Sequence, residues 1–323
     1  MKTENTLNRL TSQLHQGTPK SFRNLTLIPL FYSEKPKTKY RTLSNALKKG
    51  LIEIVEKSTG GSVPELRVIN KGDKRVLLID SEELAGAKQN RILNTSILLK
   101  KNSETIIPVS CTESGRWDYN SPEFTDSGNI AAYEIRRKKS ESVSNSLIQT
   151  REYRSNQGEV WDEIENYMRS SKTASKTRAM KDIFDNKKKK IKDYIKSLPL
   201  EKDQNGFIIL VNNKVAGFEF ISSKKAFAQL YEKLLKSYAV DALIKLETEE
   251  KTGSESDAED FWTDLNDAKT DRFKSVGHGY DNRIKGKLLT GNMLTYKGEV
   301  IHLAVFSNKG INSKPQRPRF NPF

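Results

Sequence analysis

The sequence predicts an α+β protein with a mainly antiparallel β-core, sandwich-like or jelly-roll-like, and helices packed beside it. Between residues 66 and 111, four short strand-like segments follow one another with tight turns and no helix between them. Parallel pairing would need a long crossover, usually a helix, so antiparallel pairing is favoured. Long charged helical segments then occupy residues 144–196, and strand-like segments return at residue 206.

Composition sets the broad class. The chain has 323 residues, 35% of them hydrophobic, and a formal net charge of +15. Low hydrophobic content predicts some solvated helix or tail, and the positive charge makes polyanions candidate partners, although charged helices of a soluble protein have the same composition. The single cysteine, Cys111, excludes an intramolecular disulfide and fits a reducing compartment.

Neither a secretory signal nor a membrane span is visible in the sequence. The first sixteen residues, MKTENTLNRLTSQLHQ, contain no apolar core, and no run reaches the length of a membrane span. We therefore expect a soluble, cytoplasmic protein with no membrane partner. The sequence gives no indication of its oligomeric state.

The N-terminal segments have distinct patterns. Residues 1–22 predict a flexible polar arm that holds at most one short helix. Residues 25–31 (LTLIPLF) predict a strand at a sheet edge, because Pro29 cannot donate a hydrogen bond to a neighbouring strand. Residues 42–57 predict an amphipathic helix, since apolar residues recur there at spacings of three and four.

Two hairpins are predicted next. Residues 66–70 and 75–80 flank the turn residues Lys71, Gly72 and Asp73, which is a typical hairpin signal. The second pair joins residues 92–99 to residues 104–111. We expect residues 75–80, 92–99 and 104–111 to lie in one antiparallel sheet.

The second half of the chain begins with lysine-rich helices. Four consecutive lysines at 187–190 are typical of a solvated helix face. Residues 206–221 predict a hairpin around Asn212 and Asn213, because asparagine tolerates the positive φ of a two-residue turn. Residues 224–246 predict a helix with a wide apolar face. The remaining predictions are an acidic loop with a short helix near Phe261, strands in 274–289 and 293–306, and a disordered basic tail.

One connection between predicted strands carries more polar chemistry than a turn requires. Lys88, Gln89, Asn90 and Arg91 stand in series, whereas a turn needs only glycine, asparagine or aspartate for its backbone angles. Such a set can bind phosphate, ribose hydroxyls and a base edge, with Arg91 as a bidentate clamp. The alternative is a structural network that ties the turn to neighbouring strands.

Residues on the adjacent strands extend this candidate ligand site. Asn94 lies in an alternating run beside the polar cluster. Arg116 could bind a phosphate while Trp117 stacks on a base, and core packing of Trp117 is the alternative. Cys111 is more easily explained as a small buried hydrophobe than as a nucleophile, since no histidine is near it in sequence.

Glu113 and Glu83 are the candidate catalytic acids or bases. Glu82 and Glu83 would point to opposite sides of an extended strand, so at most one of them belongs in the site. Salt bridges are the alternative role for each carboxylate. His278 and His302 are too few and too isolated for a metal site, so no metal is predicted and no cofactor can be named.

Three sequence blocks resemble a known domain family. They are ELAGAKQNRILNTSILLKKNSETIIPVSCTESGRW from Glu83, NNKVAGFEF with LLKSYAVDAL from Asn212, and SVGHGYDNRIKG from Ser275. Together they are similar to the family named for its association with ADP-ribosylglycohydrolases (ARG) and the rhodanese-phosphatase superfamily. The resemblance implies a neighbourhood of ADP-ribose, nucleotide or phosphoester metabolism and carries no established reaction.

These observations lead to one expected organisation and two functional hypotheses. The segments are a flexible arm (1–22), a single domain (23–307) with a lysine-rich helical insertion (about 144–197) and an acidic loop (about 247–271), and a disordered basic tail (308–323). The first hypothesis is a polar pocket that binds, and in a stronger version hydrolyses, a nucleotide-like or ADP-ribosyl ligand. The second is a non-catalytic nucleic-acid or protein interaction module that uses the basic helices and tail.

Overall fold

The computed structural model describes residues 6–58, 61–247 and 258–308, which form seven helices and eighteen strands. Most strand pairs are antiparallel, so the predicted α+β class with a mainly antiparallel core is confirmed. The helices are α1 (Thr6–Ser12), α2 (Leu43–Lys48), α3 (Tyr133–Thr150), α4 (Gln157–Ser170), α5 (Met180–Ser197), α6 (Lys224–Glu247) and α7 (Ala258–Asp267). None of these helices, in the described part of the chain, is long and apolar enough to cross a membrane.

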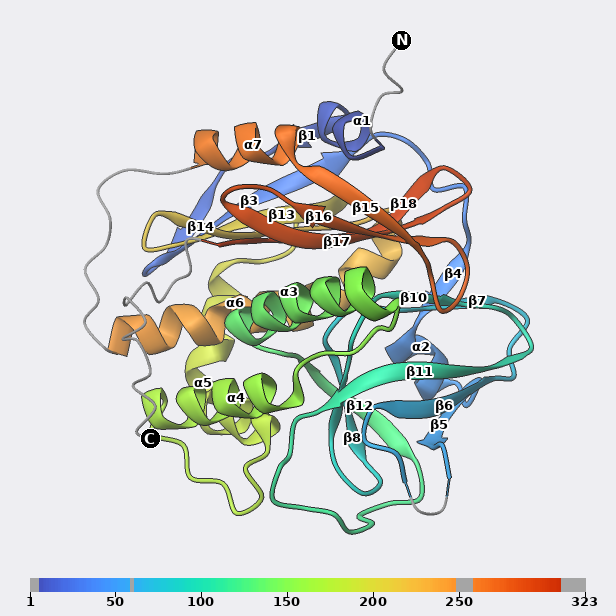
Figure 1. Ribbon diagram of the computed structural model, residues 1–323. Helices are drawn as coiled ribbons and strands as arrows, with labels where there is room; N and C mark the ends of the chain where they lie inside the picture. The colour runs from blue at the N-terminus through green and yellow to red at the C-terminus, as the bar shows by residue number, and fades with distance from the viewer. Residues whose placement is uncertain (1–5, 59–60, 248–257, 309–323) are drawn as a thin grey trace, which may run out of the picture.

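A nine-stranded sheet, here called the large sheet, forms one layer of the molecule. Its path is β1-β3-β13-β14-β18-β17-β16-β15, and β2 pairs with β3. The strands are β1 (Leu14–Gln16), β2 (Lys20–Phe22), β3 (Leu25–Tyr32), β13 (Gln204–Val211), β14 (Lys214–Ile221), β15 (Lys269–Lys274), β16 (Tyr280–Lys285), β17 (Leu289–Tyr296) and β18 (Glu299–Ser307). Figure 1 shows α1 and α7 above this sheet and α3 and α6 below it.

Apolar cores on both faces explain the composition of the central strands. In β13, Phe207 and Ile209 join the core on the α6 side, whereas Ile208 and Leu210 join the core under α1 and α7. A strand covered on both faces needs a continuous apolar run rather than an alternating one. The sequence FIILV supplies that run.

The hairpin predicted at residues 206–221 is present as β13 and β14, and Asn212 and Asn213 have φ values of 51° and 61°. The edge position predicted for residues 25–31 is wrong, because β3 pairs with β13 on one side and with β1 and β2 on the other. Pro29 is tolerated because it faces the gap between β1 and β2, where no neighbouring strand needs its N–H.

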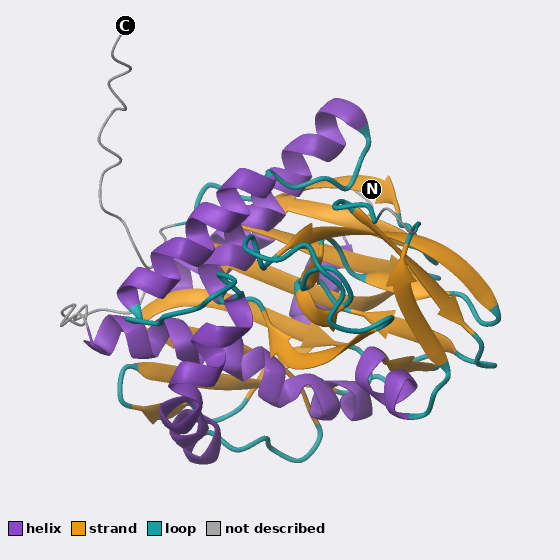
Figure 2. Ribbon diagram, turned by 90° about the horizontal axis from the view of Figure 1, so that it is seen from below, coloured by secondary structure: helices purple, strands orange, loops and turns teal. Residues whose placement is uncertain are grey.

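The second β-unit is a six-stranded sheet that curls into a half-barrel, accompanied by a three-stranded sheet. The half-barrel has the order β12-β8-β9-β11-β6-β5, and the small sheet has the order β10-β7-β4. The strands are β4 (Tyr40–Thr42), β5 (Ile52–Glu56), β6 (Glu65–Asn70), β7 (Arg75–Leu78), β8 (Glu82–Gly86), β9 (Arg91–Leu93), β10 (Ile97–Leu99), β11 (Ser103–Cys111) and β12 (Phe124–Ile130). Seen from below, helices lie along the left and lower edges of the molecule and strands extend to the right (Figure 2).

The predicted single sheet of residues 75–80, 92–99 and 104–111 is therefore wrong. β7 and β10 belong to the small sheet, whereas β9 and β11 belong to the half-barrel. The predicted hairpin of residues 66–80 is also absent, because β6 pairs with β5 and β11 instead of β7. The buried Asn70 side chain explains the separation, since it bonds to the backbone of Gly72, Lys74 and Lys100 and redirects the chain into another sheet.

The helix predicted over residues 42–57 is only half right. Thr42 accepts a hydrogen bond from the backbone of Asn45 and caps α2, but the helix ends at Lys48, just before Gly50 at φ 63°. Residues 52–56 (IEIVE) then form β5 with alternating burial. The apolar residues of this segment alternate with a period of two, which is typical of a half-buried strand, and they also match the three- and four-residue spacing of a helix.

The terminal segments contribute to the layers. Residues 6–22, expected to be a flexible arm, form α1, β1 and β2, and Leu7 and Leu10 are buried. The lysine-rich region contains α3, α4 and α5, and the helix expected at residues 224–246 is present as α6. A short helix, α7, includes Phe261 as expected. The predicted tail lies outside the described residues beyond residue 308.

We expect Gly206→Ala to destabilise the large sheet. A Cβ at Gly206 would lie 2.2 Å from the carbonyl oxygen of Glu219 on β14, and overpacking of this kind costs about 1–3 kcal/mol. Chemical denaturation monitored by circular dichroism measures the change. Gly158→Ala in α4 is the matched control, since its Cβ meets only ordinary contact at 3.4 Å; equal stability of the two variants would contradict the packing described here.

Candidate functional site

One end of the half-barrel interior is polar. Strand register pairs Arg91 with Leu84 and with Cys111, so these three side chains share a face. That face is the interior, because Leu84, Leu93 and Val109 belong to the half-barrel core. We call this end the barrel mouth and define it by Glu56, Lys88, Gln89, Arg91, Cys111, Glu113 and Trp117.

Arg91 is the central side chain of the barrel mouth. It is fully buried, and its Nη1 donates to Gln89 Oε1 at 2.9 Å and to the Asn90 carbonyl at 3.4 Å. No described residue accepts a hydrogen bond from its Nε or Nη2. These two N–H groups lie on one edge of the guanidinium, in the geometry that binds a pair of acceptor atoms. Burial lowers the pKa of Arg91, and the nearby Cys111 and Glu56 oppose that effect.

Aromatic and cationic side chains form the outer rim. The Trp117 side chain is 43% exposed, and its ring centroid lies 5.7 Å from Arg91 Cζ. Lys88 Nζ lies 5.3 Å from the Trp117 ring and 5.2 Å from the Tyr119 ring. Gly61 packs against both Lys88 and Trp117, where a Cβ would come within 3.1 Å and 3.3 Å. The rim therefore combines π surfaces with positive charge.

The Arg116 guanidinium bonds to the loop that carries it and to Glu113. Its Nη1 donates to the carbonyls of Ala87 at 2.6 Å and Asp118 at 2.8 Å, and its Nη2 pairs with Glu113 Oε2 at 2.7 Å. Burial would raise the pKa of the Glu113 carboxyl, but hydrogen bonds from Arg116 and the Asn90 backbone help to lower it below its usual value. Glu113 is thus held as a carboxylate, and Arg116 stabilises the loop.

Two predicted site residues lie on the opposite face of the same sheet. Glu83 pairs in register with Ile92, one position away from Arg91, and accepts a hydrogen bond from Thr112 at 3.1 Å. The Asn94 amide bonds to Ser110 and to the Tyr153 carbonyl. Because successive side chains of a strand alternate between faces, Glu83 and Asn94 point away from the face that carries Arg91 and cannot contact the same ligand.

The outcome for the sequence-based site is therefore mixed. The structure brings together Lys88, Gln89, Arg91, Glu113, Arg116 and Trp117. It places Asn90 inside the turn, where its side-chain oxygen accepts from Gly86, and it separates Glu83 and Asn94 from the barrel mouth. It adds Glu56, which sequence reasoning missed because β5 lies 35 positions before Arg91 and is brought there only by the curl of the sheet.

Cys111 lies inside the mouth as a buried thiol. Its Sγ contacts Gln89 Oε1 at 3.0 Å and the Glu113 carbonyl at 3.4 Å. Burial raises the pKa of Cys111, against opposing contributions from Arg91, the Glu113 backbone and Trp161. The thiol therefore stays protonated at neutral pH.

A second group of polar residues, which sequence reasoning did not assemble, is buried between the large sheet and α3. Strand register places Glu219, Ala304, Asn292 and Arg283 in one row across β14, β18, β17 and β16. Arg136 of α3 reaches this row through Nη1, which lies 2.6 Å from Glu219 Oε1. A carboxylate between Phe218 and Phe220 in an apolar strand was the available sequence signal.

The turns at residues 79–81 and 94–96 complete this buried polar layer. Asp80 Oδ1 pairs with Lys139 Nζ at 2.5 Å, and Ser96 Oγ lies 2.7 Å from His302 Nδ1. We define the layer by Asp80, Thr95, Ser96, Arg136, Lys139, Glu219, Asp281, Arg283, Asn292 and His302. Across the described residues, no three His, Cys, Asp or Glu side chains are placed to hold a metal ion.

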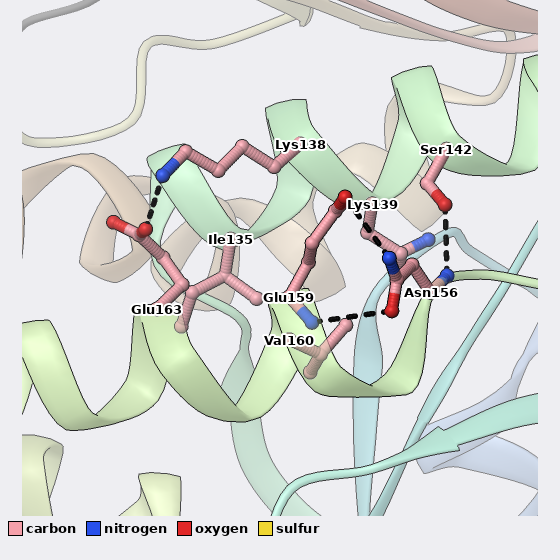
Figure 3. Close-up of a pocket in the computed structure, with 8 residues that line it drawn as sticks. All are labelled: Ile135, Lys138, Lys139, Ser142, Asn156, Glu159, Val160 and Glu163. Atoms are coloured by element: carbon pink, nitrogen blue, oxygen red, sulfur yellow. Dashed lines mark hydrogen bonds and ion pairs between the residues drawn. The ribbon is translucent and has the colours of Figure 1, made fainter. Parts of the chain in front are cut away.

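The crevice between α3 and α4 is closed by its own side chains. Figure 3 shows Lys138 reaching Glu163, and Asn156 bonded to Ser142 and Glu159. The lining side chains leave no room for a water molecule. This crevice therefore joins two helices and is not a ligand site.

The fold and the two polar regions define an α+β protein in which a large antiparallel sheet and a curled half-barrel meet across buried charges. The chain belongs to the ARPP-1 family, the ARG and Rhodanese-Phosphatase-superfamily-associated Protein domain, whose family model matches residues 13–306. This confirms the resemblance found in the sequence. No curated protein and no solved structure matches the chain.

We expect Cys111→Ser to lose about 1–3 kcal/mol of stability, because a hydroxyl costs more to bury than a thiol and its shorter bond to Cβ leaves it farther from Gln89 Oε1. The variant should keep any ligand binding, and the wild-type thiol should react slowly with iodoacetamide near pH 6, because burial raises its pKa. Mass spectrometry of the alkylated protein measures the rate. A fast reaction, or a folded variant without binding, would assign Cys111 a chemical role.

Glu83 should make stability depend on pH. Burial raises the pKa of its carboxyl from 4.5 to about 7, despite hydrogen bonds from Ser127, Thr112 and Asn129. The folded state therefore binds the proton more tightly than the unfolded state. The free energy of unfolding should fall as the pH rises from about 4.5 to about 7, and should level off above that.

Replacement of Glu83 by glutamine should remove this dependence. Glu83→Gln should gain up to about 3 kcal/mol at pH 8 and little at pH 4, since one pKa unit corresponds to about 1.4 kcal/mol. Urea denaturation at several pH values tests this. The matched control is Glu104→Gln on the exposed side of β11; the same pH profile in wild type and Glu83→Gln would contradict the assignment.

Proposed function

We propose that the barrel mouth binds a nucleotide-like ligand, a class that includes ADP-ribosyl compounds. The observation that carries the proposal is the unused edge of Arg91. Its Nε and Nη2 are buried, and no described side chain or carbonyl accepts from them. Leaving such donors unpaired costs about 1–3 kcal/mol or more, which a ligand with two adjacent acceptors would offset.

The rim supports the same ligand class. Trp117 and Tyr119 are exposed aromatic rings beside a buried guanidinium, and Lys88 lies between them. A base or another flat ring can stack on such residues, while a lysine attracts phosphate. Mouths of β-barrels are common places for small-molecule sites.

The hydrolytic version of the proposal depends on Glu113. Its lowered pKa suits a general base rather than a general acid. Glu83, the other candidate, lies on the opposite face of the sheet. Any hydrolytic step at the barrel mouth would therefore use Glu113 without Glu83.

The second hypothesis, a polyanion-binding module, draws support from α5. Lys188, Lys189, Lys192 and Lys196 are exposed on this helix, whereas Lys187 and Lys190 pair with Glu247. Binding through such a surface would weaken steeply with added salt. Binding of a small ligand in the buried barrel mouth would be specific for one compound, and the stabilisation would increase with its concentration according to mass action.

A thermal-shift screen over nucleotides, ADP-ribose and divalent ions tests the proposed function. At least one nucleotide-like compound should raise the Tm of the wild type. Arg91→Lys keeps the charge but loses the two-donor edge, so the compound's Kd should rise about tenfold to a hundredfold, as expected for losing a hydrogen bond to a charged group.

The matched control is Arg67→Lys, an arginine 41% exposed on the outer face of β6. It should keep the full ligand-induced shift. Comparison of shifts, rather than of absolute Tm values, separates binding from any loss of stability. Absence of stabilisation by every compound, or an undiminished shift in Arg91→Lys, would reject the proposal.

A further inference from the structure

A buried carboxylate, Glu56, lies near Arg91 in the barrel mouth. Glu56 is the last residue of β5, an edge strand of the half-barrel. Its side chain is buried; Oε1 accepts from the Lys88 backbone at 3.4 Å, and no described group donates to Oε2. Glu56 was not among the residues expected from the sequence.

Glu56 and Arg91 are near each other without forming an ion pair. Glu56 lies close enough to Arg91 to affect its electrostatics, yet within the described chain no carboxylate oxygen comes within ion-pair distance of that guanidinium. The mouth thus presents two adjacent donors on Arg91 and an unsatisfied acceptor on Glu56. A ligand that fits both must offer two acceptors next to donors of its own.

Charge decides which part of a nucleotide meets this pair. Glu56 and Glu113 are both carboxylates of the mouth, and a phosphate placed between them would be repelled in a site of low dielectric constant. A neutral base avoids that repulsion. Lys88 at the rim is the better partner for a phosphate, because it lies beside the exposed rings of Trp117 and Tyr119.

We infer that the barrel mouth selects a guanine base, with O6 and N7 accepting from Arg91 and the N1–H and N2–H groups donating to Glu56. This inference rests on the proposed function and specifies its ligand. Arginine binds O6 and N7 of guanine bidentately, and this contact discriminates strongly between bases. Adenine would face Arg91 with an amino donor beside N7, and would face Glu56 with the acceptor N1, so both contacts fail.

Access to Arg91 requires Trp117 to move. The guanidinium is fully buried, while the indole that touches it is partly exposed. A guanine that reaches Arg91 must therefore displace or restack the indole. Binding should change the tryptophan fluorescence, and most of the change should be lost in Trp117→Phe, which keeps Trp262 and the Trp161 beside Cys111.

The experiment compares GMP, AMP, ADP-ribose, guanosine and inorganic phosphate by calorimetric titration. We expect GMP to bind at least about tenfold more tightly than AMP or ADP-ribose, the range expected for one good bidentate contact. Guanosine should compete with GMP, whereas phosphate should not. In Glu56→Gln the preference for GMP over AMP should fall to less than about threefold, because the amide no longer accepts two donors.

The matched control is Glu53→Gln, on the same strand but on its outer face, where Glu53 pairs with Lys71. It should keep the guanine preference, and thermal melts establish that both variants are folded. If Glu56→Gln does not fold, the guanosine and phosphate competitions in the wild type decide the question. Equal affinity for GMP and AMP, displacement of GMP by phosphate, or an unchanged preference in folded Glu56→Gln would overturn the inference while leaving the proposed function intact. If no compound binds, the proposed function itself fails.

Discussion

The contact of helix α3 with both β-units depends first on the ion pair between Arg136 and Glu219, which joins α3 to the large sheet. Both side chains are fully buried and lie 2.6 Å apart, and Tyr238 donates to the same carboxylate oxygen. Two charges taken out of water cost several kcal/mol each, so they persist only in a geometry that satisfies them. That geometry exists only when α3 lies over β17 and β18 at the position from which Arg136 reaches Glu219 on the neighbouring β14. The pair therefore specifies how the helical layer sits on the large sheet.

The same layer orients the half-barrel. Ser96 and Thr95 follow β9 and reach His302 and Asp281 on the large sheet. Lys233 of α6 lies 2.7 Å from Glu82 of β8 and 2.6 Å from Asp126 of β12. The segment from β8 to β10 is thus fixed by buried polar contacts at one end and carries Arg91 at the other. A polar layer of this kind favours one relative position of the two units more than an apolar interface would.

Local patterns were predictable, whereas long-range pairing was not. The hairpin around Asn212 and Asn213 and helix α6 follow from turn chemistry and a single clear period, and both are present. The apolar spacing of the IEIVE segment fitted both a helix and a strand, and it is a strand. Residues 66–80 do not form a hairpin because the Asn70 side chain bonds to distant backbone, including that of Lys100. In the site, Lys88–Arg91 and Glu113–Trp117 were found because they are close in sequence, but Glu56 needed the curl of a six-stranded sheet.

Arg91 and Arg136 show why one buried arginine stabilises the fold and the other is the basis of the proposed site. Each uses Nη1 in the protein and leaves Nε and Nη2 without a partner among the described residues. Arg136 has a carboxylate in contact and lies over Phe306 and Tyr238, at 4.8 Å and 5.7 Å from their ring centroids, so its charge is compensated. Arg91 also lies over a ring, that of Trp117 at 5.7 Å, but among the described residues it has only an amide and a carbonyl oxygen, and no carboxylate, within hydrogen-bonding distance. A buried charge without a compensating partner destabilises the folded state. A ligand that accepts hydrogen bonds from Arg91 would offset that destabilisation.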